Sequence, residues 1–304
     1  MLRARTYEKF GSFLLFRKLH ADALSELWRG ARLPGGEPTA VRRFIGGDLD
    51  ALRAAAESAG RIVPHLTGTT IVRKQQIGVS DASPFIAFHY SGGRPLGHIV
   101  ESAQRSKVPN PVPIDQALTI AEKVAQSLVT LHHLKLQGRR LSHGALLPDF
   151  IWVSEDGEIR VAGQQMTEGF VRSRSVSDVS TLIDPYLAPE LIEGEEAGPR
   201  SDMYSLGAIL FLLLTGRQPP RPSSSTSVVT ALDEARLQTS GEAIPPELRS
   251  LLDRTIAWEP GGRFLSPAEA HRCVSTLLQA DQYTATTFNL AFYLTTLLKE
   301  DLQR

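Results

Sequence analysis

The stretch Leu141–Val153 has the residue types and the spacing of a loop at the edge of an active site. It contains His143 and Pro148 and ends in the β-rich run Ile151–Val153, a pattern that predicts a turn leading into a short strand. The turn positions where polar side chains could do chemistry hold small or apolar residues instead: Gly144, Ala145, Leu147 and Phe150. The sequence therefore predicts an active-site loop from which the reactive groups are missing.

The composition is that of a globular protein, and it excludes some classes of function. In 304 residues, 33 Lys and Arg balance 33 Asp and Glu, so the chain lacks the excess positive charge with which nucleic-acid-binding proteins neutralise phosphates. The longest wholly apolar run, Ala208–Leu214, is far shorter than a membrane span, so we expect no membrane insertion within this chain. The single cysteine, Cys273, cannot form a disulfide within the chain, which favours a reducing, cytoplasmic compartment.

The first third of the sequence predicts a β-rich lobe with one helix. Short β-compatible runs separated by turn signals indicate strands at Phe13–Phe16, Leu27–Leu33, Thr39–Phe44, Ile71–Val79 and Pro84–Tyr90. Asp48 is a favourable N-cap before the Ala- and Leu-rich stretch Leu49–Ser58, which predicts the helix. The segment Ser91–Pro95 contains two glycines and a proline and is a candidate hinge.

The middle and the end of the chain predict a larger helical lobe. Apolar residues at helical spacing follow Ile114. The stretch Asp202–Thr215 is apolar on every face in its second half, which indicates a helix buried all round. Amphipathic helices are predicted at Leu248–Trp258 and Pro267–Leu278. The segment Gly163–Leu182 has no clear period and many Ser, Arg and Asp residues, which predicts a mobile surface loop.

The last residues predict a further helix. The positions that follow helical spacing are Phe288, Ala291, Phe292, Thr295, Leu298 and Leu302, widened by Leu294 and Leu297. We expect this apolar stripe to dock on the helical lobe, with a partner protein or a further domain as the alternative. The expected architecture is α+β, with a small lobe at 1–90, a helical lobe at 91–280 and a helical extension at 281–304.

Several ordered motifs resemble those of bacterial serine/threonine protein kinases. Tyr186–Glu190 ends in the Ala-Pro-Glu motif, and Ser201–Gly207 followed by Leu213–Pro220 resembles the buried central helix of that family. Ile244–Leu248 and Pro260–Arg263 resemble its closing helices. The similarity covers roughly residues 7–280 and implies the bilobal protein-kinase fold.

The resemblance also implies roles for four structural residues. In the family, the motif glutamate pairs with a late arginine, here Glu190 and Arg263, and an aspartate, here Asp202, braces the loop that begins at His143. All of these residues are present in the sequence, so we expect the framework around the catalytic loop to be intact.

The catalytic positions of the family do not match. Aligned on His143, the catalytic aspartate falls on Ala145, the loop lysine on Leu147, the metal-binding asparagine on Phe150 and the Asp-Phe-Gly aspartate on Gly163. Phosphoryl transfer depends on positioning and charge neutralisation, and Mg²⁺ requires oxygen ligands. These side chains supply neither a base, nor a cation, nor metal ligands.

The small lobe departs from the family as well. The glycine-rich loop falls on Leu19–Leu27, which contains no glycine, so its backbone cannot approach phosphates closely. The strand lysine falls on Arg42, with Arg43 as the alternative, and its helix partner is expected at Glu57. We expect an ion pair between Arg42 and Glu57 that serves structure alone.

Trp152 occupies the position that would form the floor under an adenine ring. One interpretation is that Trp152 and Phe150 fill the nucleotide cleft, and the other is that Trp152 turns into the core of the helical lobe. His89 and Tyr90 follow the gatekeeper position Phe88, where the family contacts nucleotide, and they are vestigial candidates for such contacts.

These observations predict a pseudokinase, a kinase-like domain without catalysis that binds another protein or another domain of a larger chain. We expect no cofactor and no metal, since His132 and His133 are adjacent and the other histidines show no ligand spacing. Two alternatives stay open: an active kinase with an atypical site, and a switch that binds ATP without chemistry.

Overall fold

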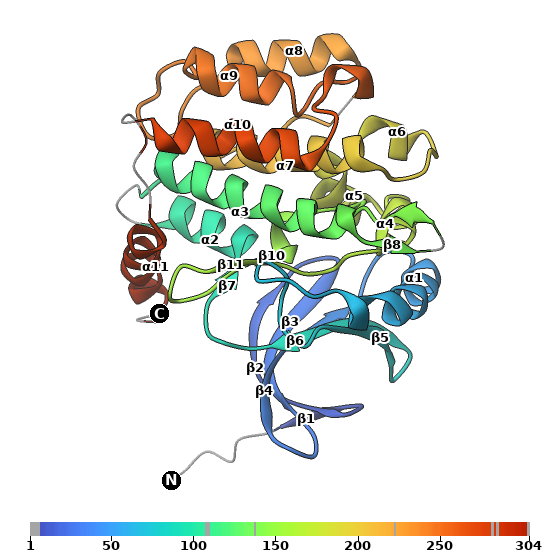
Figure 1. The fold of residues 1–304 in the computed structure, drawn as a ribbon. Helices are drawn as coiled ribbons and strands as arrows, with labels where there is room; N and C mark the ends of the chain where they lie inside the picture. The colour runs from blue at the N-terminus through green and yellow to red at the C-terminus, as the bar shows by residue number, and fades with distance from the viewer. Residues whose placement is uncertain are drawn as a thin grey trace.

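The computed structural model describes residues 7–106, 110–136, 138–221, 223–280, 283 and 286–302. They form two lobes, a sheet-rich lobe at the bottom of Figure 1 and a helical lobe above it. This is the predicted α+β, two-lobed architecture. Residues of both lobes line a cleft that contains a cavity of about 310 Å³.

The small lobe is built on an antiparallel sheet with the order β1-β2-β3-β4-β6-β5. Its strands are β1 (Glu8–Phe10), β2 (Phe13–Ala21), β3 (Ser25–Arg32), β4 (Glu37–Phe44), β5 (Gln76–Ser80) and β6 (Ser83–His89). Helix α1 (Leu49–Ile62) begins where predicted, because the Asp48 side chain accepts a hydrogen bond from the backbone N–H of Ala51. Its apolar face packs on β5 and β6 and buries Leu52 and Ala56.

One predicted strand of this lobe is too long. The strand expected at Ile71–Val79 begins only at Gln76, and Ile71 instead makes an isolated parallel bridge with Val161 of the large lobe. The backbone N–H of Val161 donates to Thr70, and that of Val72 donates to Val161. The chain leaves the small-lobe sheet here because its β-type residues pair with the other lobe, which fixes the two lobes to each other.

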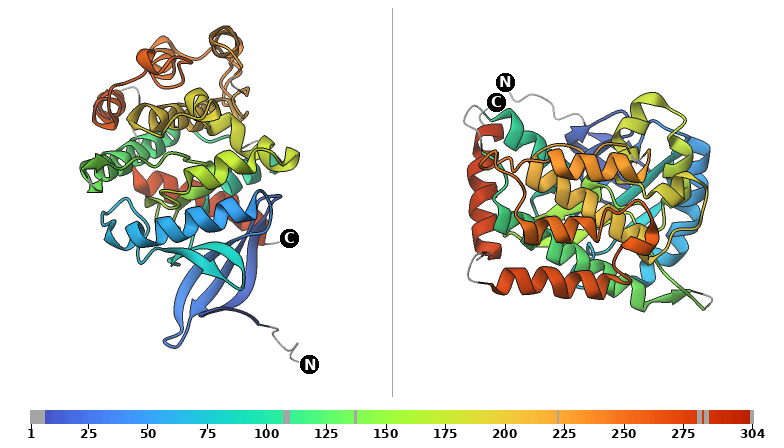
Figure 2. Two further views of the ribbon diagram at one scale, coloured as in Figure 1. Left: turned by 90° about the vertical axis from the view of Figure 1, so that its right-hand side faces the viewer. Right: turned by 90° about the horizontal axis from the view of Figure 1, so that it is seen from above.

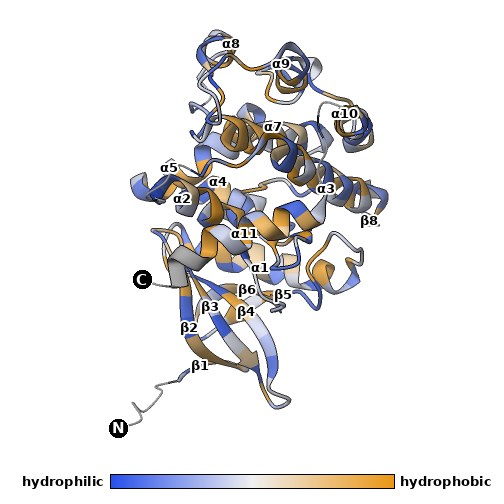
Figure 3. Ribbon diagram, turned by 90° about the vertical axis from the view of Figure 1, so that its left-hand side faces the viewer, coloured by the Kyte–Doolittle hydropathy of each residue, from blue (hydrophilic) through white to orange (hydrophobic). Residues whose placement is uncertain are grey.

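The large lobe consists of helices packed around one fully buried helix. Its helices are α2 (Leu96–Arg105), α3 (Ile114–His133), α6 (Pro189–Ile192), α7 (Pro199–Thr215), α8 (Ser225–Glu234), α9 (Pro246–Asp253) and α10 (Pro267–Gln279). As predicted, α7 is buried at every position from Ser201 to Thr215, and Figure 3 shows it mostly in the hydrophobic colours. It ends at Gly216, whose left-handed φ of 68° lets the N–H donate to Leu212.

A small antiparallel sheet lies between the lobes. It has the order β11-β10-β7, from β7 (Arg94–Pro95), β10 (Ile151–Val153) and β11 (Ile159–Val161). A 3₁₀ turn over Pro148–Phe150 leads directly into β10, which confirms the predicted turn and short strand. A short hairpin, β8 (Lys135–Leu136) with β9 (Arg139–Arg140), precedes this loop.

The predicted mobile loop at Gly163–Leu182 is wrong. The segment forms two short helices, α4 (Thr167–Ser173) and α5 (Ser177–Ile183). Helix α4 packs closely against α1. The approach requires a glycine at position 169, because a Cβ there would come within 2.9 Å of the Leu52 side chain. Helices of two turns show little periodicity, and these are stabilised by tertiary burial of Phe170 and Val179.

Helix α11 (Thr287–Leu302) docks against α2 and α3, as Figures 1 and 2 show. The predicted inner stripe is partly wrong, because Phe288 and Phe292 are 75% and 69% exposed. The buried face is formed by Leu290, Tyr293, Leu294 and Leu297. The Tyr293 hydroxyl donates to the carbonyl of Asn110 at 2.9 Å, which sets the rotation of the helix. In the described part of the chain, no helix combines the length and apolar character needed to cross a membrane.

Candidate functional site

The loop that begins at His143 is held by one buried carboxylate. Asp202 accepts hydrogen bonds from the backbone N–H groups of His143 at 2.8 Å and Gly144 at 2.7 Å, and its Oδ2 lies 2.7 Å from Nε2 of His132. Gly144 has a left-handed φ of 84°, and a Cβ there would meet Oγ1 of Thr167 at 1.9 Å. Burial lowers the pKa of the His143 imidazole, whose Nε2 lies 2.9 Å from the Ala162 carbonyl. Asp202 of α7 thus fixes the backbone of the loop at His143 and Gly144.

The second structural pair is also in place. Nη1 and Nη2 of Arg263 donate to the two carboxylate oxygens of Glu190 at 2.7 and 2.9 Å. Glu190 additionally accepts from the Ser201 hydroxyl, and Arg263 donates to the carbonyls of Ala257 and Trp258. A buried ion pair of this kind is tolerated only because its hydrogen-bonding groups are paired.

The reactive face of the loop is apolar and buried. Ala145, Leu147 and Phe150 all belong to the hydrophobic core, and none of them has a side-chain group that accepts or donates a proton. Asp149 is the carboxylate of this loop, and sequence reasoning missed it. The signal that could have identified it is a lone acid inside an otherwise apolar turn.

Phe150 and Gly163, the two positions where the family would bind metal, are in contact with each other. Gly163 has a left-handed φ of 80°, and a Cβ there would lie 2.9 Å from Cγ of Phe150. The Phe150 ring packs against that of Phe170 from α4, with centroids 5.3 Å apart. An aspartate at position 163 and the present Phe150 ring therefore cannot occupy this space together.

The predicted ion pair between Arg42 and Glu57 is wrong. Glu57 is exposed on the outer face of α1, whose inner face is made of leucine and alanine. Arg42 is buried and donates from Nη1 to the Ser25 hydroxyl at 2.7 Å and from Nη2 to the carbonyl of Asp149 at 3.0 Å. Its guanidinium also lies 3.7 Å from the Asp149 carboxylate. Asp149, and not the predicted helix glutamate, is therefore the carboxylate beside Arg42.

The turn that aligns with the glycine-rich loop is closed by its own carboxylate. Oδ1 of Asp22 accepts hydrogen bonds from the backbone N–H groups of Leu24 at 2.8 Å and Ser25 at 2.7 Å. In a phosphate-binding loop, such N–H groups point at the ligand. Here they are already satisfied by a negative charge.

Trp152 lies in the cleft rather than in the core of the large lobe. Its ring makes edge contacts with Phe88 and Tyr90, with centroids 5.2 and 5.9 Å away, and its Nε1 donates to the Gly92 carbonyl at 2.9 Å. The remaining cavity between Trp152, Phe88 and Phe150 has a volume of about 10 Å³. A single water molecule needs roughly 10–15 Å³, so this space excludes an adenine ring.

The vestigial hinge candidates are engaged inside the protein. The backbone N–H of His89 donates to Arg73 at 2.9 Å, and that of Tyr90 donates to Pro38 at 3.0 Å. The guanidinium of Arg29 lies 5.2 Å above the Tyr90 ring. The backbone N–H groups of His89 and Tyr90 therefore bind other parts of the protein.

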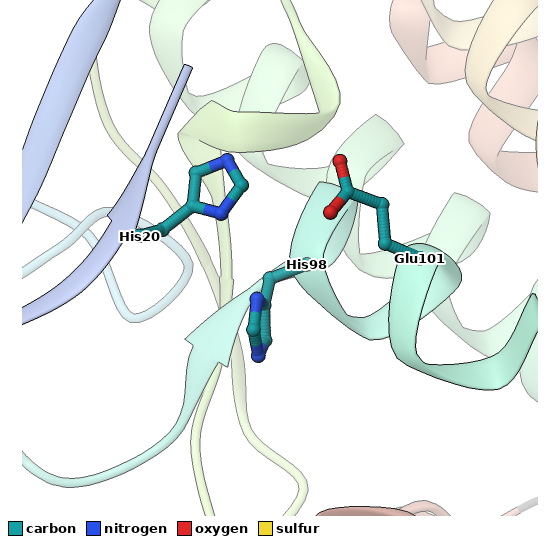
Figure 4. A group of neighbouring side chains, drawn as sticks. All are labelled: His20, His98 and Glu101. Carbon is teal, nitrogen blue, oxygen red and sulfur yellow. The ribbon is translucent and has the colours of Figure 1, made fainter. Parts of the chain in front are cut away.

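The open part of the cleft contains a polar cluster that sequence reasoning missed. His20, His98 and Glu101 have potential ligand atoms within 4.8 Å of one another, and His20, Asp22 and Asp149 form a second group of the same kind. Figure 4 shows His20 on the small lobe opposite His98 and Glu101 on α2. The helical spacing of His98 and Glu101 is visible in the sequence, but the approach of His20 across the cleft is not.

Comparisons with known proteins identify the family and the fold. A family model described as the protein kinase domain matches residues 53–284. The serine/threonine-protein kinase PksC of Streptomyces coelicolor is 30% identical over 236 residues, which is 74% of this chain and 41% of PksC. PknL of Mycobacterium tuberculosis is 24% identical over 261 residues, which is 83% of this chain and 62% of PknL.

Among solved structures, the kinase domain of Mycobacterium tuberculosis PknI superposes with a TM-score of 0.66 at 20% identity, over 88% of this chain and 96% of that chain. This likeness shows the bilobal fold. Because the kinase-domain model matches well over half of the residues, the chain belongs to the protein kinase family, and its curated relatives include bacterial serine/threonine kinases.

Proposed function

We propose that this protein kinase domain is a pseudokinase, which does no phosphoryl transfer and acts as a binding or regulatory module. The observation that carries the proposal is that aromatic side chains fill the adenine part of the nucleotide cleft. Trp152, Phe88 and Phe150 leave a cavity of about 10 Å³ where adenine would have to lie. Without adenine, the phosphates have no anchor in the cleft.

The chemistry of the surrounding groups supports the same proposal. Phosphoryl transfer requires an oriented nucleophile, metal ions that bridge the phosphates and cations that neutralise developing charge. Ala145 cannot orient a hydroxyl, and the Phe150–Gly163 contact leaves no room for metal-binding carboxylates. Arg42, the nearest buried cation, is already bound to Ser25 and Asp149.

The ligand we propose is another protein or another segment of a longer chain. The chain spans about 41% and 62% of the length of PksC and PknL, so relatives of this domain occur within longer proteins. The framework of Glu190, Arg263 and Asp202 maintains the shape of the large lobe. A fold that keeps its shape but lacks reactive groups offers a partner a defined surface.

The test is a titration of the purified chain with ATP and Mg²⁺ in which binding is measured as a shift of the Tm. A ligand present at about 100 times its Kd stabilises the folded state by about 2.7 kcal/mol, which shifts the Tm by several degrees. We expect no saturable shift at millimolar ATP and no transfer of radiolabelled phosphate with Mg²⁺ or Mn²⁺.

The Arg42→Met variant is the matched control for that titration. A saturable shift in the unmodified protein that is lost in Arg42→Met would overturn the filled cleft and favour a nucleotide-binding switch. Phosphate transfer that is abolished by Arg42→Met would overturn the assignment as a pseudokinase.

A further inference from the structure

Two elements from different lobes present paired metal-ligand side chains to each other at the open edge of the cleft. The end of β2 and the turn after it carry His20 and Asp22, and the first turns of α2 carry His98 and Glu101. Potential ligand atoms of His20, His98 and Glu101 lie within 4.8 Å of one another. Asp22 and Asp149 form a second such group with His20, so His20 belongs to both.

The backbone explains why these pairs converge. His98 and Glu101 are three residues apart on a helix, which places both on one face. His20 and Asp22 are two residues apart at the end of a strand, where alternate side chains share a side. The turn fixes Asp22 through Oδ1, and Oδ2 is left 3.8 Å from Nε2 of His20. The two imidazole rings lie 5.7 Å apart at an angle of 73°.

We propose that this cluster is a binding site for a divalent transition metal of the Zn²⁺ class. His20 and His98 supply nitrogen ligands and Glu101 supplies an oxygen ligand, and water takes the fourth position, because Asp22 and Asp149 group with His20 but not with His98 and Glu101. Imidazole and carboxylate groups suit Zn²⁺, whereas Mg²⁺ prefers oxygen ligands and bound water.

The geometry requires only small side-chain movements. Ligand atoms around a tetrahedral Zn²⁺ lie roughly 3.3 Å apart, given Zn–N distances of about 2.0–2.1 Å. The cluster must therefore contract by up to about 1.5 Å, which rotation of the His98 and Glu101 side chains on α2 can supply. Glu101 currently lies 3.3 Å from Arg105 in an exposed ion pair, and such pairs contribute little to stability.

The site differs from the metal positions of the kinase family, which here are Phe150 and Gly163. Its ligands come from β2 in the small lobe and from α2 in the large lobe. A bound ion would therefore tie the two lobes together at the mouth of the cleft. The consequence is a clamp on lobe movement that does not depend on nucleotide.

The test uses the full chain after removal of metals with a chelator. Titration with Zn²⁺ is followed by calorimetry and by thermal unfolding, and Co²⁺ serves as a spectroscopic probe of ligand geometry. We expect one Zn²⁺ per chain, a saturable rise in Tm with Zn²⁺ but not with Mg²⁺, and Co²⁺ absorption bands typical of a tetrahedral site.

Two ligand variants and one control separate this site from surface binding. His20→Ala and His98→Gln should each weaken Zn²⁺ binding by more than about 100-fold, since even changes to outer-shell partners cost 10–100-fold. His65→Ala changes an exposed histidine outside the cluster and should leave the affinity unaltered.

Unchanged Zn²⁺ affinity in both ligand variants, or absence of stoichiometric binding to the unmodified chain, would overturn the proposal. If either variant fails to fold, the Co²⁺ spectrum of the unmodified chain still decides, because bands without imidazole ligation contradict the site.

Discussion

The loop that begins at His143 is buried on two sides, the side toward α7 and the side toward the cleft. Charged side chains surround it on the first side and aromatic side chains on the second. Below the loop, Asp202, Glu190 and Arg263 are charged and their polar atoms are hydrogen-bonded. Above it, Phe150 stands where the family has an asparagine, and the rings of Phe150 and Trp152 fill the space. The difference indicates that the hydrogen bonds from Asp202 set the shape of this loop, whereas the side chains that face the cleft fill space.

The largest expected effect comes from breaking the charged framework. Glu190→Ala leaves the guanidinium of Arg263 buried without its carboxylate, and removing one partner of a buried pair destabilises a fold by about 3–5 kcal/mol. Urea unfolding measures this loss. Glu168→Ala is the matched control, because Glu168 forms an exposed pair with Arg172 on α4, where a loss below about 1 kcal/mol is expected. Equal losses in the two variants would show that the framework does not determine stability.

The second prediction concerns the aromatic face of the cleft. Trp152→Ala removes a buried ring and its hydrogen bond to Gly92, and we expect a loss of about 3 kcal/mol, near the lower end for such truncations because the cleft edge can relax. Trp28→Ala, a half-buried tryptophan on β3, should cost less. A smaller loss at Trp152 than at Trp28 would mean that the ring occupies a space that the fold does not require.

The smallest effect is expected from the outer charges of the small lobe. Burial by itself would raise the pKa of Glu26. Hydrogen bonds from Lys18, Arg43 and Trp28 outweigh burial and lower this pKa from 4.5 to about 2. A carboxylate with a lowered folded-state pKa contributes its full stability above pH 4.5 and loses it as the pH falls through about 2.

The unfolding free energies of the unmodified chain and of Glu26→Gln should therefore differ at about pH 5 and converge toward about pH 2. The measurement is urea unfolding at both values. A difference that stays constant over this range would show that the ionised form of Glu26 has no role in the fold.

The fold was predictable because its strongest signals are local. The helix predicted at Asp202–Thr215 is apolar on every face in its second half and is followed by glycine, so its burial and its end followed from the sequence, although it begins at Pro199. Asp48 likewise marked the start of α1. The two helices within Gly163–Leu182 were missed because they are stabilised by contact with α1, and a short helix has too few turns to show such a contact as a pattern.

The site was predictable only where residue identity alone decides the chemistry. The alanine at position 145 cannot act as a base in any conformation. The partner of Arg42 depended instead on which face of α1 turns inward, and the sequence pointed to Glu57 rather than Asp149. The histidine cluster depends on contact between His20 and His98, which are far apart in the chain.

The left-handed backbone at Gly144 has a consequence for protein engineering. A side chain there would collide with Thr167 at the start of α4, so the arginine of an active kinase cannot be installed by one substitution. Both the strained backbone at position 144 and the Thr167 side chain would have to change, and Thr167 begins α4, which packs on α1. Restoring the family's arginine at this position would therefore take coordinated changes at several residues, which makes the proposed pseudokinase a suitable starting scaffold for designed binders.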